Sequence, residues 1–246
     1  MQLVFLGTGG YHPNQRRHTA CLLLPQVGVM LDAGTGMFRA AQYLQGLELD
    51  IFLSHAHLDH VVGLTYLFDL LEVHPLQRVT VHAESDKLQA VQQHLFAAAL
   101  FPKMPPYRFQ PIQQNTALPG GGLLRHFPLE HPGGVLGYRL DWPGRSMAYV
   151  TDTMASPDAP YLAEIKGVDL LVHECYFSDR HKDWAVKTGH SCTSAVARLA
   201  ADAAVRRLLL THINPLDGGD DPVDLASARA IFPATDIAED GMTLEF

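Results

Sequence analysis

Four residues within a six-residue stretch carry side chains that bind metal ions: His55, His57, Asp59 and His60. They directly follow Asp50–Leu53, a short apolar run that is typical of a buried strand. Side chains at positions i and i+2 of an extended segment point the same way, so His55 and His57 can hold one ion. Asp59 and His60 lie where the chain turns into the next helix, where they can face a second ion. Imidazole and carboxylate ligands suit zinc, manganese or iron.

Three further polar residues close apolar runs of the strand type, where a side chain emerges from a sheet edge. They are His131, Asp152 and His212. Two ions need more ligands than the first four residues supply, so these three are the candidates for the remaining positions. Taken singly, each is also explained as a polar residue at a strand end. Two ions about 3.5–4 Å apart can clamp both oxygens of a phosphoryl displacement.

Taken in this order, the residues resemble the metallo-β-lactamase fold: H-x-H-x-D-H after a strand, a lone His, an Asp in V-T-D-T and a His in L-T-H. The resemblance runs from Leu3 to about Pro215. It implies two metal sites joined by a bridging Asp152. One ion would be held by His55, His57 and His131, and the other by Asp59, His60 and His212.

Asp32, in the motif L-D-A-G, matches an Asp that orients a metal ligand through a hydrogen bond in this family. The alternative is a turn residue before Gly34.

Local motifs are similar to the phosphodiesterase branch of the fold that includes ribonuclease Z. The chain has L-G-T-G from Leu6, H-L-D-H-V-V-G-L from His57, G-Y-R from Gly137, H-E from His173 and G-H-S from Gly189. In that branch the last two motifs supply a dyad, which here would be Glu174 and His190. The resemblance implies that His190 donates a hydrogen bond or a proton to a phosphate oxygen while Glu174 orients its ring. The plainer alternatives are a strand-end carboxylate in solvent for Glu174 and a helix-start residue for His190.

The chain departs from the ribonuclease Z pattern in one respect. Members that process transfer RNA carry a long Gly/Pro-rich arm, which in the common form lies between the lone His and the bridging Asp. Only 20 residues separate His131 from Asp152, and Asp141–Gly144 predicts a tight hairpin turn. The net charge of −8 also argues against broad binding of nucleic acid. Cleavage of transfer-RNA precursors is therefore less favoured than a smaller substrate.

The pattern of apolar residues predicts the elements that position these side chains. Short apolar runs bounded by Gly and Pro predict strands at residues 2–6, 19–24, 29–32, 50–53, 79–82, 123–129, 137–140, 147–151, 170–174 and 208–211. Helices are expected over 34–46, 61–73, 87–101 and 194–204, the last capped by Ser191 or Thr193. Residues 102–122 are expected to be irregular. We predict one α/β domain over 1–246: the αββα sandwich of the metallo-β-lactamase fold, with two mixed sheets flanked by helices.

Composition narrows the class of protein further. Hydrophobic residues make up 47% and charged residues 18% of 246 residues, which is typical of a globular chain. Cys21, Cys175 and Cys192 lack C-x-x-C spacing, so we expect buried thiols and a reducing, cytoplasmic location. No apolar run approaches a membrane span, and the first residues do not read as a signal peptide.

The function predicted from these observations is a metal-dependent hydrolase, namely a phosphodiesterase. A hydroxide bridging two divalent ions, zinc with manganese or iron as alternatives, would attack a small or cyclic phosphodiester or an RNA end. Asp59 and Asp152 would hold the hydroxide. Arg17 and His18 could reach the phosphate, and the alternative is that both lie in a surface loop. The alternatives are a transfer-RNA 3′-processing endonuclease of the ribonuclease Z type, a hydrolase of thioesters, lactones or lactams, and a binding protein without activity. A homodimer is expected from the relatives.

Overall fold

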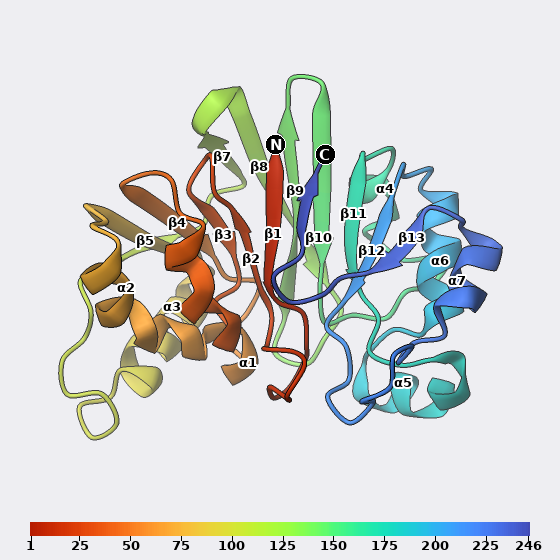
Figure 1. Ribbon diagram of the computed structural model, residues 1–246, viewed down its shortest axis with the longest axis horizontal. Coiled ribbons are helices and arrows are strands. Elements are labelled where there is room, and N and C mark those ends of the chain that lie inside the picture. Colours follow the sequence, from red (N-terminus) through yellow and green to blue (C-terminus); the bar gives the residue numbers. More distant parts are fainter. The chain divides into compact units, whose positions relative to one another are not determined.

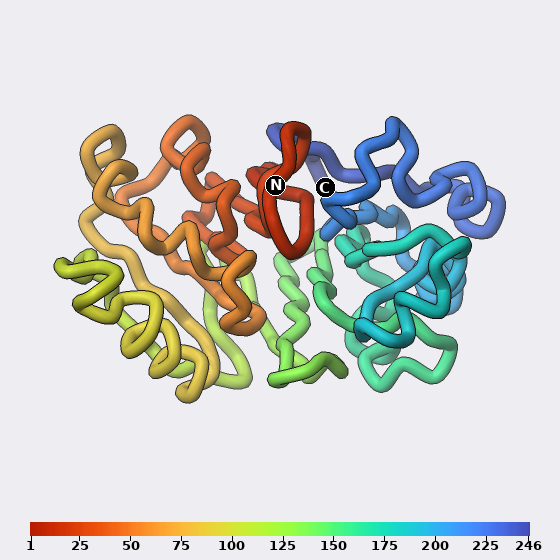
Figure 2. Tube along the Cα trace, turned by 90° about the horizontal axis from the view of Figure 1, so that it is seen from below, coloured from red at the N-terminus to blue at the C-terminus, as the bar shows by residue number.

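The computed structural model describes residues 1–246, which form two compact units. Unit 1 comprises Met1–Gln113 and Glu239–Glu245, and unit 2 comprises Gln114–Ala238 and Phe246. In Figure 2 the chain runs from red to yellow-green through the first segment of unit 1, and from green to blue through unit 2. Each unit contains one mixed sheet of seven strands with helices packed on it, which confirms the two predicted sheets. A single domain over 1–246 stays a prediction.

The sheet of unit 1 has the strand order β14-β1-β2-β3-β4-β5-β6. Strands β14 to β3 pair antiparallel, and β3 to β6 pair parallel. In Figure 1, β14 lies beside β1, so the end of the chain completes the sheet that its beginning starts. The strands are β1 (Gln2–Gly7), β2 (Cys21–Leu24), β3 (Val29–Leu31), β4 (Glu48–Phe52), β5 (Arg78–Ala83), β6 (Arg108–Pro111) and β14 (Thr243–Glu245).

One face of this sheet is covered by short helices. Met37, Leu64 and Leu67 from the helices pack with Ile51 and Val81 from the strands, and all five are fully buried. The helices are η1 (Thr35–Gln42), α1 (Leu58–Val61), η2 (Val62–Tyr66), α2 (Leu67–Val73), α3 (Ser85–Ala90) and the π-helical η3 (Val91–Leu95).

Two helix predictions in unit 1 need correction. The helix expected over 61–73 begins at Leu58 and is divided into three segments. The helix expected over 87–101 begins at Ser85 and ends in a π turn at Leu95. A proline disfavours the helical conformation of the residue before it, so Pro102 keeps Phe101, the last residue of the expected helix, out of a helix.

A polar cluster joins β4 to β5 in unit 1. Arg78 Nη1 donates to Asp50 Oδ1 over 2.8 Å, and His82 Nε2 lies 3.0 Å from the same oxygen. Burial opposes ionisation of Asp50, but the hydrogen bonds from His82 and Arg78 and the charge on Arg78 outweigh it and lower the pKa of Asp50 to about 2. The cluster therefore fixes the pairing of these two strands with an ionised carboxylate.

The sheet of unit 2 has the order β13-β12-β11-β10-β9-β8-β7. Strands β7 to β10 pair antiparallel, and β10 to β13 pair parallel. The strands are β7 (Asn115–Leu118), β8 (Gly122–Leu129), β9 (Val135–Trp142), β10 (Arg145–Val150), β11 (Leu170–Glu174), β12 (Leu208–Thr211) and β13 (Thr235–Ile237). The predicted hairpin turn lies between β9 and β10. Residues 102–122, expected to be irregular, contain β6 and β7, because their pairing depends on the neighbouring strands more than on their own polar residues.

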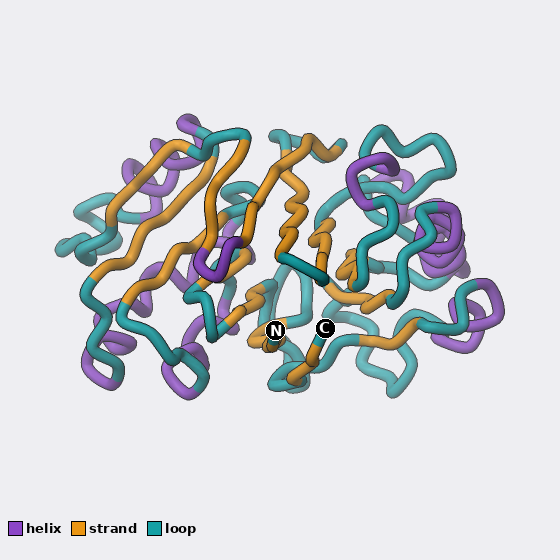
Figure 3. Tube along the Cα trace, turned by 90° about the horizontal axis from the view of Figure 1, so that it is seen from above, coloured by secondary structure: helices purple, strands orange, loops and turns teal.

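Helices α4, α6 and α7 lie on one side of the strands of unit 2 and contribute to a single hydrophobic core (Figure 1 and Figure 3). Val196 and Leu199 of α6 pack with Leu171, Leu208 and Leu210 of the sheet. Cys192 is the N-cap of α6, in place of the expected Ser191 or Thr193, and its side chain makes no capping hydrogen bond. The helices are η4 (Pro119–Gly121), α4 (Leu162–Ile165), η5 (Asp179–His181), α5 (Lys182–Thr188), α6 (Thr193–Asp202) and α7 (Leu225–Ile231). None of the helices in either unit is long and apolar enough to cross a membrane.

Candidate functional site

In unit 1, the segment between β4 and α1 carries the H-x-H-x-D-H motif. The rings of His55 and His57 lie 4.3 Å apart between centroids, and the ring of His60 lies 4.3 Å from that of His55. His60 Nε2 is 3.4 Å from Asp59 Oδ2. The structure therefore brings together all four residues that the sequence predicts here, with His55 and His60 buried and His57 exposed.

The carboxylate of Asp32 holds His60 and Ser54 of this segment in place. It accepts hydrogen bonds from His60 Nδ1 over 2.8 Å, from the Ser54 backbone N–H over 2.7 Å and from Ser54 Oγ over 2.9 Å. Ser54 Oγ in turn lies 2.9 Å from His55 Nδ1. Because a carboxylate only accepts, His60 donates from Nδ1, and its Nε2 then carries the lone pair that a metal ion needs. This arrangement is consistent with the role that the resemblance implies for Asp32, which is to orient a metal ligand through a hydrogen bond.

In unit 2, the predicted residues follow the ends of neighbouring strands. Asp152 comes after β10, Glu174 ends β11 and His212 follows β12. These strands are parallel, so their carboxyl ends meet at one edge of the sheet. Asp152 Oδ1 is 3.3 Å from His212 Nε2, and Asp152 Oδ2 is 3.8 Å from His131 Nε2.

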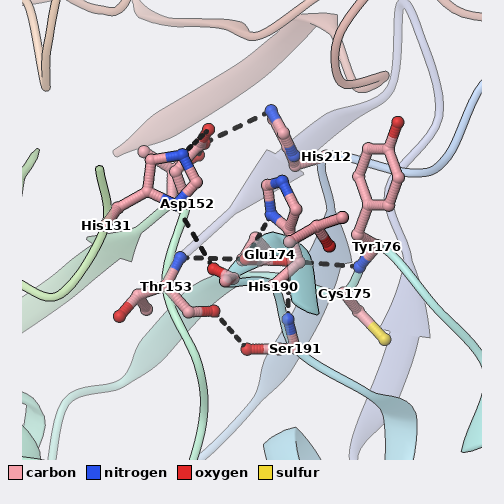
Figure 4. A network of polar contacts seen from close by, with 12 residues as sticks. His131, Asp152, Thr153, Glu174, Cys175, Tyr176, His190, Ser191 and His212 are labelled. Carbon is pink, nitrogen blue, oxygen red and sulfur yellow. Dashed lines mark hydrogen bonds and ion pairs between the residues drawn. The ribbon is translucent and has the colours of Figure 1, made fainter. Parts of the chain in front are cut away.

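Glu174 is fully buried and holds His190 (Figure 4). Its Oε1 lies 2.9 Å from His190 Nδ1 and accepts from the Thr153 backbone N–H, also over 2.9 Å. Its Oε2 accepts from the backbone N–H groups of Tyr176 at 3.1 Å and Ser191 at 3.3 Å. Three backbone donors can only donate, so the carboxylate accepts on all sides and His190 donates from Nδ1. The structure thus brings Glu174 and His190 into hydrogen-bonding contact. The alternative that Glu174 is a carboxylate in solvent is wrong, because its side chain is fully buried.

Sequence reasoning gave no role beside this pair to Tyr176, Ser191 or Thr153. The ring of Tyr176 is stacked on that of His190, with centroids 4.6 Å apart and planes 17° apart. Ser191 Oγ donates to the Thr153 carbonyl over 2.7 Å and accepts from the Ala155 N–H over 2.8 Å. Thr153 and Ser191 stand in the V-T-D-T and G-H-S motifs, and Tyr176 lies two residues after H-E, but a motif does not say which way such a side chain points.

The donor set in each unit fits a divalent metal ion. In unit 2, His131 Nδ1 donates to the Gly189 carbonyl over 3.3 Å, which directs Nε2 towards the carboxylate of Asp152. In unit 1, Asp32 directs Nε2 of His60 towards Asp59 in the same way. A hydrogen bond on the outer ring nitrogen and a carboxylate beside the inner one are typical of metal-binding histidines.

All three cysteines are buried packing groups, as expected, and His173 is buried as well. Burial raises the pKa of Cys192 to about 11 and that of Cys175 further, so both stay protonated. Burial lowers the pKa of His173, which accepts from the Tyr161 hydroxyl over 2.9 Å and donates to the Glu174 carbonyl over 2.7 Å.

The expectation that Arg17 reaches a substrate phosphate is wrong. Its side chain is buried, and it donates to Thr8 Oγ1 over 2.6 Å and to Glu239 Oε1 over 2.7 Å. His18 lies 3.1 Å from Thr35 Oγ1 and lines a mostly apolar cavity of about 610 Å³ in unit 1. Arg17 therefore supports the glycine turn after β1 through Thr8, whereas the imidazole of His18 contacts Thr35 at the start of η1.

The chain is similar in sequence to known proteins over most of its length. The β-lactamase superfamily domain matches residues 28–213. Ribonuclease BN from Salmonella paratyphi B is 31% identical over 307 residues, with 98% of this chain and 98% of that protein covered. Ribonuclease Z from a Nostoc species is 30% identical over 308 residues, with coverage of 100% and 95%. Both alignments are longer than the 246 residues of this chain, so these relatives contain segments that it lacks.

The solved structures show the same fold. The metallo-β-lactamase fold protein YhfI from Bacillus subtilis matches with a TM-score of 0.81 at 19% identity, covering 99% of each chain. The superfamily match and the two ribonuclease relatives thus confirm the resemblance seen in the motifs, and the chain belongs to the β-lactamase superfamily, in its ribonuclease Z-like branch.

Proposed function

We propose that the chain is a metal-dependent phosphodiesterase that hydrolyses a small or cyclic phosphodiester or the end of an RNA. One observation carries this proposal: His190, held by Glu174, lies in the same cluster as His131, Asp152 and His212. Hydrolysis of a phosphodiester needs charge stabilisation at the phosphoryl oxygens and a proton for the leaving oxygen. A positioned His beside metal-type ligands answers both needs.

The metal ligands we propose are those that the motifs named: His55, His57, Asp59, His60, His131, Asp152 and His212. Two divalent ions, zinc with manganese or iron as alternatives, would use these nitrogen and oxygen donors. Such ions, when bound, activate water and neutralise charge on a phosphoryl group. The tautomers that Asp32 and the Gly189 carbonyl impose on His60 and His131 support this assignment.

The Glu174–His190 pair then moves a proton. With Nδ1 donating to Glu174, His190 can carry a second proton on Nε2, and the buried carboxylate stabilises that charged ring. Transfer of the Nε2 proton to the leaving oxygen leaves a neutral imidazole that still donates from Nδ1. Asp32 has a different role, since it holds His60 directly and His55 through Ser54.

RNA is a specific second candidate substrate, because the two relatives are named ribonucleases. The lack of an arm and the net charge of −8 favour a short RNA end over a whole transfer-RNA precursor. Hydrolysis of an acyl substrate would make little use of a proton donor aimed at a phosphate oxygen. The homodimer stays a prediction.

The test is hydrolysis of bis(p-nitrophenyl) phosphate by metal-loaded protein. We expect His190→Ala to lower kcat by about 100-fold, because positioned acid–base groups contribute about 10²–10⁴-fold. His94→Ala, which removes an exposed histidine on η3, is the matched control and should have wild-type rates. Unchanged turnover in His190→Ala, or turnover of p-nitrophenyl acetate but not of the diester, would refute the proposed reaction. Full metal content in His57→Ala would refute the ligand assignment.

A further inference from the structure

Tyr176 lies flat against the imidazole of His190 (Figure 4), with ring centroids 4.6 Å apart and planes 17° apart. The backbone causes this placement. Beyond β11, Phe177 forms an isolated parallel bridge with Cys192, and its N–H donates to the Ser191 carbonyl over 3.2 Å. The segment after Glu174 is thereby fixed beside the segment that carries His190.

The stack supplies something that the hydrogen bond to Glu174 cannot. One hydrogen bond fixes the position of His190 Nδ1 but leaves the ring able to rotate about the line from Nδ1 to Oε1. The outer side-chain torsion of a histidine is itself broad and does not select one plane. A ring stacked nearly parallel on the imidazole removes that rotation, because aromatic pairs prefer offset-stacked or edge-to-face geometry.

Two other rings lie near His190, and neither is as nearly parallel to it. The ring of His131 is tilted by 50° at 5.1 Å, and that of His212 lies at 5.5 Å with planes 28° apart. Both are candidate metal ligands, so a metal ion and not the His190 ring would set their orientation. Tyr176 is the nearest and most nearly parallel ring of the three.

We propose that Tyr176 is a positioning residue that acts through His190: its ring fixes the imidazole plane and so the direction of Nε2. One part of this inference rests on the proposed function, namely that Nε2 of His190 points at a phosphate oxygen of the substrate. The main-chain contribution of Tyr176 is separate, since its N–H donates to Glu174 Oε2 whatever the side chain is. Side-chain variants at this position therefore test the ring alone.

The kinetic test is a double-mutant cycle on bis(p-nitrophenyl) phosphate. We expect Tyr176→Leu to lower kcat about tenfold while KM changes less than about twofold, because a misplaced catalytic group costs rate more than binding. Tyr176→Phe keeps the ring and should restore most of the rate. In the His190→Gln background, Tyr176→Leu should cause no further loss. An equal loss in both backgrounds would show a general structural effect and overturn the proposal.

A second readout does not depend on activity. In metal-free protein labelled with ¹³C-histidine, the His190 ring signal is identified by its loss in His190→Gln. A stacked aromatic ring shields it, so it should move downfield in Tyr176→Leu and stay in place in Tyr176→Phe, while the His94 signal is constant. If wild-type protein does not hydrolyse the diester, the proposed function fails, and this shift still decides whether Tyr176 fixes the ring. An unmoved His190 signal in Tyr176→Leu would overturn the inference.

Discussion

Asp32→Asn tests whether one buried carboxylate sets the metal-binding form of two histidines. Asp32 is fully buried and accepts from His60 Nδ1, the Ser54 backbone N–H and Ser54 Oγ at 2.7–2.9 Å. Through Ser54 Oγ it also reaches His55 Nδ1. Asparagine has nearly the same shape but replaces one acceptor oxygen with an NH₂ donor. The backbone N–H of Ser54 keeps the remaining carbonyl oxygen as its acceptor, so the NH₂ group faces His60.

Two donors then oppose each other, and His60 must change. If its ring adopts the other tautomer, Nδ1 accepts from the side-chain amide of the introduced asparagine and Nε2 carries the proton. The nitrogen nearest Asp59 then no longer has a lone pair for a metal ion. The backbone is not a confounding factor. Asp32 has a φ of 57°, and asparagine tolerates this left-handed conformation as well as aspartate does.

The expected loss is about 10–100-fold in metal affinity, which is typical when the outer partner of a ligand is removed. That range corresponds to about 1.4–2.7 kcal/mol. The assay is competition for zinc against a chromophoric chelator, with Asp69→Asn as the control because Asp69 is a carboxylate on α2 of the same unit, away from the H-x-H-x-D-H segment. Wild-type affinity in Asp32→Asn, with the protein folded, would refute the argument that Asp32 selects the tautomer.

Three further predictions concern stability and the dyad. Because the folded pKa of Asp50 is about 2 and its ordinary value is 3.8, its stabilisation is complete above about pH 4 and is lost as the pH falls towards 2. Asp50→Asn should therefore lower the free energy of unfolding at pH 7 by about 1–2 kcal/mol, allowing for partial exposure, and should cost much less at pH 2 in urea denaturation. A Cβ at Gly63 would overlap two backbone carbonyl oxygens, so Gly63→Ala should cost about 3 kcal/mol or more, whereas Gly218→Ala, with no atom within 4 Å, should stay within about 0.5 kcal/mol by the same measurement. Glu174→Gln places an NH₂ group against backbone donors and should lower both kcat, by about 100-fold, and the thermal midpoint; wild-type values for both would contradict the role of Glu174.

The positions of the candidate ligand residues could be predicted because each is set by the short apolar run that it follows or ends. Asp152 and His212 each follow a short apolar run, and apolar runs in parallel strands end at one edge of the sheet. Glu174 ends such a run itself. The structure brings these three residues together for that reason, without any contact having to be known in advance.

Other parts of the structure depend on partners distant in sequence. The sequence makes Arg17 a candidate for binding a phosphate, but its partner Glu239 lies 222 residues further along the chain. The short strands β6 and β7 form because β5 and β8 present free edges to them, and nothing in their polar composition indicates it. Tyr176 belongs to the same class, because only the pairing of Phe177 with Cys192 places it on His190.

Backbone strain points to the candidate site by a route that does not use motifs. Six non-glycine residues have a positive φ, and three of them are Asp32, Asp152 and His212, with φ of 57°, 45° and 54°. Each follows a strand end, where a left-handed residue turns the chain sharply at the sheet edge. Glycine would adopt this conformation without the steric cost, which is of order 1 kcal/mol for a residue such as His. Glycine has no side chain that could bind a metal ion or accept a hydrogen bond, however. A carboxylate or an imidazole at these positions therefore costs stability but supplies a functional group, which is common for strained residues at functional sites.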